Sequence, residues 1–153
     1  MIGRLSLAAT LAGLACGGAT QTPAPDSPTA SVQQFLAAVK ANDLQRMGRL
    51  WGTSKGPAAD WMDQRELYRR LTVIQKYLAH EGSRVLEGPL PSGTGQANVR
   101  GFRVELQRPR CALVLPIDVV RTGSGGWVVL DVHLADAGNP VAPCAPPGGG
   151  TGP

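Results

Sequence analysis

Two aspartates and a histidine make the most pointed chemical pattern in the sequence: Asp118, Asp131 and His133. They lie on either side of the run Gly123–Gly126, whose glycines suit the positive φ values of a β-hairpin turn. If Ser124-Gly125 is a two-residue loop, Asp118 faces Asp131 directly, and His133 follows two residues later on the same face. Two carboxylates beside a histidine are the groups that proton transfer or metal binding would use. The three residues are therefore the candidate catalytic set.

The opposed carboxylates also have a cost. Like charges directly opposite one another destabilise a sheet unless something compensates for them. Compensation could come from protonation of one carboxyl, from a bound cation, or from an arginine on the neighbouring strand such as Arg103. A metal site would need a third or fourth protein ligand, and the sequence places none there. We therefore predict no metal and no cofactor.

The strands that carry these residues are expected at 111–122 and 127–135. In the register set by a two-residue loop, eight aliphatic side chains share one face, which must be covered by other elements. The acids and the histidine then point to the opposite face, where charged side chains are the usual solvated surface of an antiparallel sheet. This placement argues against catalysis. The aliphatic face consists of Leu113, Leu115, Ile117, Val119, Val128, Leu130, Val132 and Leu134.

Amphipathic helices supply the cover. A helix is expected over 29–41, with Ser27 and Pro28 at its start, and a second short helix after Asp43. The run 52–57 is expected to be a loop by composition. A third helix is expected over 61–80, with Asp60 as its N-cap. Its leucine and isoleucine residues recur every three or four positions, and Gly82 is expected to end it.

Two further strands are expected before the hairpin, at 83–90 and 96–107, and prolines place the first at an edge. Helices followed by an antiparallel meander predict an α+β fold. In it, N-terminal helices pack on a curved antiparallel sheet of about four strands that ends in a long hairpin.

The segment from Ala30 to Leu44, ASVQQFLAAVKANDL, resembles the opening of nuclear transport factor 2-like domains, with cystatin-like folds as the neighbouring alternative. Such domains begin with an amphipathic helix, an Asn-Asp-Leu break and a second helix ending near an aromatic residue, here Trp51. The Gly-Gly-Trp-Val-Val-Leu strand is also similar to the family's last strand. The resemblance covers about 29–135 and implies a conical sheet.

The same resemblance implies two functional features. In enzymes of this superfamily, isomerases and dehydratases among them, an acid or base points into a pocket between the sheet and the helices. Members also dimerise through the outer sheet face, which would here present Val114, Val120, Trp127 and Val129.

The start of the chain has the pattern of an export signal. Arg4 precedes an apolar run of small residues that is too short to span a bilayer and ends at Cys16. Ala15-Cys16 resembles the lipobox of bacterial lipoproteins, in which the cysteine is lipidated. Ordinary signal cleavage nearby, or a start codon placed too early, are the alternatives. We expect a signal at 1–16, a flexible tether at 17–28, the domain at 29–138 and a Pro/Gly-rich tail at 139–153.

Two cysteines remain once Cys16 is assigned to the anchor. Cys111 begins the first hairpin strand, and Cys144 lies just beyond the end of the second. The ends of an antiparallel pair are neighbours, so a disulfide is feasible in an oxidising compartment. Two unpaired thiols are the alternative.

The formal net charge of +4 is spread among interspersed acids, few aromatic residues are present, and no nucleic-acid motif occurs. Nucleic acid is therefore excluded as a partner. We expect an exported bacterial protein, lipid-anchored and facing the periplasm or the exterior, that acts as a non-enzymatic binding or interaction domain. Its candidate partners are the membrane, a second copy, another envelope protein or a small apolar ligand. The alternative is an isomerase- or dehydratase-like enzyme.

Overall fold

The computed structural model describes residues 23–141 of the chain, and Cys16 and Cys144 lie outside that range. The described part contains three α-helices, one short 3₁₀ helix and six strands. Their order is α1 (Pro28–Lys40), α2 (Leu44–Leu50), β1 (Gly52–Thr53), β2 (Gly56–Pro57), η1 (Ala58–Asp60), α3 (Gln64–Leu78), β3 (Gly82–Pro91), β4 (Val99–Arg108), β5 (Cys111–Arg121) and β6 (Trp127–Val132).

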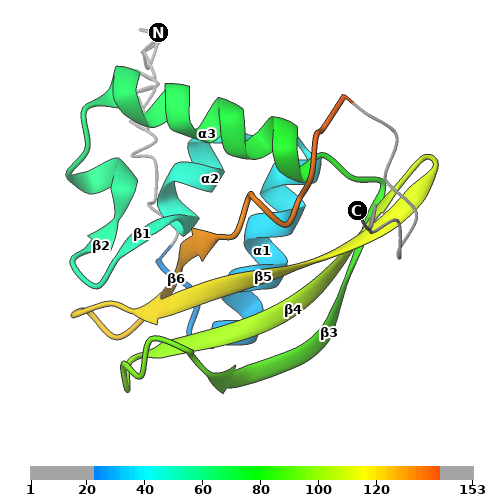
Figure 1. Cartoon of the computed structure of the whole chain (residues 1–153). Coiled ribbons are helices and arrows are strands. Elements are labelled where there is room, and N and C mark those ends of the chain that lie inside the picture. The colour runs from blue at the N-terminus through cyan, green and yellow to red at the C-terminus, as the bar shows by residue number, and fades with distance from the viewer. Residues whose placement is uncertain (1–22, 142–153) are drawn as a thin grey trace, which may run out of the picture.

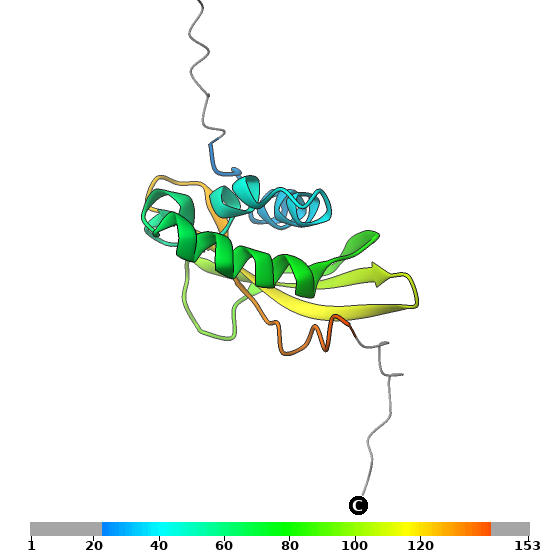
Figure 2. The ribbon, with the colours of Figure 1, turned by 90° about the horizontal axis from the view of Figure 1, so that it is seen from above.

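The predicted α+β class is confirmed. Strands β3 to β6 form one antiparallel sheet in sequence order, and each pairs with the next. The three helices lie together on one side of this sheet (Figures 1 and 2). Short connections between sequential strands explain the order, because an antiparallel meander needs no crossover.

The first two helices begin where the sequence predicts. Ser27 caps α1 by accepting a hydrogen bond from the backbone N–H of Ala30 at 3.1 Å, and proline occupies the first turn. Asp43 caps α2 in the same way through the N–H of Arg46 at 2.9 Å. Asn42 between them has a positive φ of 54°, a conformation that asparagine tolerates better than most residues.

The third helix is shorter than predicted. Its N-cap is Asp63, which accepts from the N–H of Glu66 at 3.0 Å, whereas Asp60 ends the preceding 3₁₀ turn. Both aspartates have the right chemistry, and the 3₁₀ turn delays the start of the helix. The helix ends before Ala79, whose backbone is extended, and Gly82 already belongs to β3. Gly82 therefore does not terminate the helix as predicted.

The core lies between the helices and the sheet, where the predicted apolar cover is found. Side chains of α1, α2 and α3 pack there against the inner residues of β4, β5 and β6. All of these interlocking side chains are almost wholly buried. The largest of them are Phe35, Leu36, Met47, Leu71, Leu78, Phe102, Leu106, Leu115 and Ile117.

The β5–β6 register differs from the prediction by one residue near the turn. Arg121 and not Thr122 faces Trp127, and Val119 faces Val129. A β-bulge then restores the predicted pairing, so that Asp118 does face Asp131. The turn is one residue longer than a two-residue loop, with Gly125 at a φ of +99°.

The bulge reverses the expected faces of Trp127–Leu130, whereas Val132 lies in the core as predicted. Val129 is fully buried in the core, and Trp127 packs against that core, whereas Val128 and Leu130 lie on the outer side with Val120. The outer apolar face that would dimerise in the resembling family is therefore not present as predicted. Of its four residues only Val114 is substantially exposed, at 40%.

A small β1–β2 hairpin replaces the expected loop at 52–57. Gly52 pairs with Pro57, and Thr53 pairs with Gly56. Trp51, just before it, bridges to Val129 and so attaches this hairpin to the free edge of β6.

Both ends of the described chain pack on the fold. Before α1, Pro25 is buried, and its carbonyl accepts a hydrogen bond from the N–H of Trp127 at 2.8 Å. After β6, the segment to residue 141 runs beside the C-terminal end of α3 (Figure 2). Arg108 holds it there by donating to the carbonyls of Ala137 and Tyr77.

Candidate functional site

The space between the helices and the sheet is filled by apolar side chains. Among residues 23–141 the buried polar residues are Ser31, Ser92 and Thr122, and none of the buried residues is an acid or a base. The Oγ of Ser31 has no hydrogen-bond partner within that part of the chain. An acid positioned between the sheet and the helices, as the enzyme alternative requires, is therefore absent from the described residues.

Asp118 and His133 form a pair on the opposite, outer face of the sheet. The Nε2 of His133 lies 3.1 Å from Oδ2 of Asp118. The Asp118 side chain is 16% exposed, because it lies over Gly101 of the neighbouring strand. A Cβ at Gly101 would come within 3.2 Å of Oδ1, so the missing side chain makes room for the carboxylate. His133 is thus the hydrogen-bond partner of the carboxylate, and its imidazole is 39% exposed.

Asp131 faces Asp118 across the ladder but points into solvent. The expected arginine does not compensate the pair, because Arg103 forms an ion pair with Glu87 at 3.3 Å. His133 is the partner of Asp118 instead. Within residues 23–141 no group of three or more histidines, cysteines or acids is arranged to hold a metal ion. The three candidate residues thus come together, but on an open surface.

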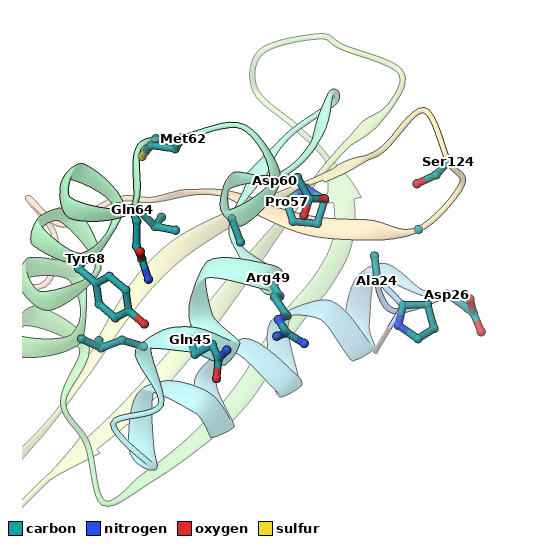
Figure 3. A pocket seen from close by; sticks show the side chains of 15 residues that line it. Ala24, Asp26, Gln45, Arg49, Pro57, Asp60, Met62, Gln64, Tyr68 and Ser124 are labelled. Atoms are coloured by element: carbon teal, nitrogen blue, oxygen red, sulfur yellow. The ribbon is translucent and has the colours of Figure 1, made fainter. Parts of the chain in front are cut away.

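A hollow lies elsewhere on the molecule, between α2 and the start of α3. We call it the α2–α3 hollow, and its volume is about 680 Å³. Residues from the segment 23–26 and from the β5–β6 turn also line this hollow. Leu44 and Leu67 contribute apolar wall, and Figure 3 shows the labelled polar side chains around the opening. This size falls within the range of small-ligand sites.

Arg49 is the central cation of this hollow. It also lines a smaller neighbouring hollow of about 220 Å³ and is half-buried. The arginines that form ion pairs in the described residues are Arg69, Arg70, Arg84 and Arg103. Arg49 thus has no acid partner within residues 23–141.

Comparison with family models, curated proteins and solved structures finds no match in any of the three. The inference of function therefore depends on the geometry.

His80 lies just after α3, which ends at Leu78. Its Nδ1 is 2.7 Å from the carbonyl oxygen of Leu78. Burial lowers the pKa of His80, and the positive charges of Lys40 and Arg108 lower it further, whereas the Leu78 carbonyl acts in the opposite direction. This histidine binds a helix end and lines none of the hollows described above.

The lipidation and disulfide predictions depend on residues beyond the described chain. Cys16 and Cys144 both lie outside it, and Cys111 is a half-buried residue at the first position of β5. Among residues 23–141 there is also no helix long and apolar enough to cross a membrane.

The α2–α3 hollow could not be predicted from the sequence, because the residues that line it come from four separate segments. Gln45 and Arg49 stand one helical turn apart on α2, which is a weak signal by itself. Gln64 and Tyr68 repeat that spacing on α3. Only the fold shows that these two pairs share one opening.

Proposed function

We propose that this chain is a non-enzymatic binding or interaction domain, lipid-anchored at Cys16 in a bacterial cell envelope. The fold type that we propose is the nuclear transport factor 2-like cone. The observation that carries the non-enzymatic role is the filled interior. The space between the helices and the sheet is filled by core side chains that are each at most 2% exposed, among them Phe35, Leu71, Phe102 and Leu115.

The enzyme alternative depends on Asp118 and His133. General acid–base catalysis gains from a site that excludes water and holds the substrate against the catalytic groups. The pair lies on an outer sheet face, with Arg84–Glu105 and Arg103–Glu87 ion pairs along the neighbouring strands. Such a surface supports solubility better than catalysis.

The envelope location is supported by the pattern at 1–16, and it has a consequence for the hollow. Pro23 lines the α2–α3 hollow, and seven residue steps separate it from Cys16. A fully extended chain of that length spans about 25 Å at most. A lipid on Cys16 would therefore keep the hollow near the membrane surface, where an envelope ligand would meet it.

Labelling with radioactive palmitate in a bacterial host tests the anchor. We expect the full-length chain to incorporate the label and to sediment with membranes, and Cys16→Ser to lose both properties. Mass spectrometry of the mature protein gives an independent readout, since processing removes Met1. A mature chain that retains Met1, or a Cys16→Ser chain that still sediments with membranes, contradicts the proposal.

A joint variant tests the non-enzymatic role. In a strain in which deletion of the gene has a phenotype, Asp118→Asn combined with His133→Gln removes both ionisable groups of the outer-face pair. A binding domain should still complement the deletion with this variant. Loss of complementation by a folded variant would favour the enzyme alternative.

A further inference from the structure

Arg49 lines the hollow and forms no ion pair with an acid of residues 23–141, so its guanidinium is available to bind an anion. Arg49 is half-buried, and two aspartates, Asp26 and Asp60, line the same hollow without pairing with it. The planar guanidinium presents a fork of N–H donors that matches a carboxylate with two parallel hydrogen bonds. The unpaired fork therefore indicates a carboxylate or phosphate ligand.

Uncharged polar groups surround this cation. In Figure 3 the Gln45 amide lies beside Arg49, and the Gln64 amide and the Tyr68 hydroxyl point toward the same space. A glutamine amide offers two donors and one acceptor oxygen, which is the complement of a peptide unit. One amide beside the guanidinium and a second amide on α3, facing the same space, match the last peptide bonds and the carboxylate of a chain end.

The remaining lining narrows the class of ligand. Asp26 and Asp60 place negative charge around the same opening, which disfavours phosphates and other multiply charged anions. Leu44, Leu67 and Met62 supply apolar surface for side chains. A peptide end matches the whole lining: its single carboxylate suits the guanidinium, its backbone amides suit the glutamines, and its apolar side chains suit the apolar residues.

We propose that the α2–α3 hollow binds the free carboxylate end of a short extended peptide, with Arg49 pairing with the carboxylate. Four extended residues span about 13 Å, a ligand size suited to a hollow of about 680 Å³. The proposal deepens the binding role proposed above, but it does not depend on the lipid anchor, so the two can fail separately.

The test is a titration of the full-length chain with a randomised tetrapeptide pool that has free carboxyl ends. The same pool amidated at its C-terminus serves as the ligand control. The Nε–Hε signal of Arg49 in a nitrogen–proton correlation spectrum is the readout. We expect the free-acid pool to shift this signal and the amidated pool to leave it in place.

Variants then separate recognition from folding. Arg49→Gln should weaken binding at least about tenfold, and Arg49→Lys, which keeps the charge without the fork, should lie between it and the parent. Arg65 is an exposed arginine on α3 that does not line the hollow, so Arg65→Gln, with the same loss of charge, should bind like the parent. Thermal melts establish that each variant is folded.

Three results would overturn the proposal. One is the absence of any shift with about 10 mM free-acid pool, which is about ten times the Kd of a millimolar site that recognises the carboxylate and backbone shared by every member. Another is equal binding of the acid and amide pools, or of the parent and Arg49→Gln. The third is displacement of the peptide by equimolar inorganic phosphate, which would identify a general anion site. Loss of peptide binding with intact palmitate labelling would leave the envelope assignment standing.

Discussion

The β1–β2 hairpin gives a sharp test of the packing that shapes the α2–α3 hollow. A Cβ at Gly52 would lie 2.2 Å from the carbonyl oxygen of Gly56 and 2.9 Å from the nitrogen of Ala58. Real Cβ contacts essentially never fall below 3.0 Å, so the backbone would have to move by nearly an ångström. The N–H of Ala58 donates to the Trp51 carbonyl at 2.7 Å, and that bond would be strained.

We therefore expect Gly52→Ala to lower the free energy of unfolding by about 2–4 kcal/mol. Overpacking contributes about 1–3 kcal/mol of this loss, and the weakened hydrogen bond contributes about 1 kcal/mol. The backbone of Gly52 does not have a positive φ, so both losses follow from the contacts of the added Cβ and none from a left-handed backbone. Pro57, its partner in the ladder, lines the hollow, so the same change should also disturb ligand binding there.

Two other glycines separate contact from backbone strain. Gly56 has a φ of +129° and open space around its Cβ position, so Gly56→Ala should cost about 1–3 kcal/mol through strain alone. Gly93 has neither a positive φ nor a neighbour within 4 Å, and Gly93→Ala should stabilise by about 0.4–1 kcal/mol. Urea unfolding of the full-length chain, followed by tryptophan fluorescence, measures all three changes. A Gly52→Ala variant no less stable than Gly93→Ala would refute the close approach described here.

Three further predictions concern charged groups. Burial and the charges of Lys40 and Arg108 lower the pKa of His80 below its ordinary value of 6.5, so the unfolded chain takes up the proton first. The unfolding free energy should therefore fall as the pH drops below about 6.5, and His80→Gln should flatten that slope in urea titrations. Asp131→Asn removes the like charge opposite Asp118 and should raise the free energy of unfolding by about 0.2–1 kcal/mol, with a smaller gain at 1 M salt. Chemical denaturation measures this change, and a destabilised variant would contradict the prediction. Arg108→Ala leaves two carbonyls without their donor and should cost about 1–3 kcal/mol, with faster amide exchange after β6; unchanged exchange would argue against this anchor.

The helical half of the fold could be predicted because its signals are local and redundant. In α3 the buried residues Leu67, Leu71, Ile74 and Leu78 repeat at helical spacing, and the period alone gives both the element and its inner face. The α+β class followed from the order of such elements. Caps were less certain, because Asp60 and Asp63 have the same chemistry three residues apart.

The β1–β2 hairpin could not be predicted from the same kind of signal. Strands of two residues are too short to show an alternation, and Gly52–Pro57 has the composition of a loop. What makes this segment a hairpin is the attachment of Trp51 to Val129, a contact between parts of the chain far apart in sequence. The α2–α3 hollow likewise depends on contacts between distant segments, so it could not be predicted either.

The β6 bulge was hidden because Trp127–Leu130 is apolar at every position, so polarity does not show which side chains point inward. Packing in the core sets the orientation, because Val129 and Val132 are both buried. Side chains of a regular strand alternate between the two faces, so two buried residues three positions apart require one extra residue, which is the bulge.

That extra residue is also what places Asp131 opposite Asp118. In the register that holds near the turn, Asp118 would instead face Leu130. The opposed carboxylates are thus a consequence of burying two valines. An arrangement that packing alone explains does not need a catalytic purpose.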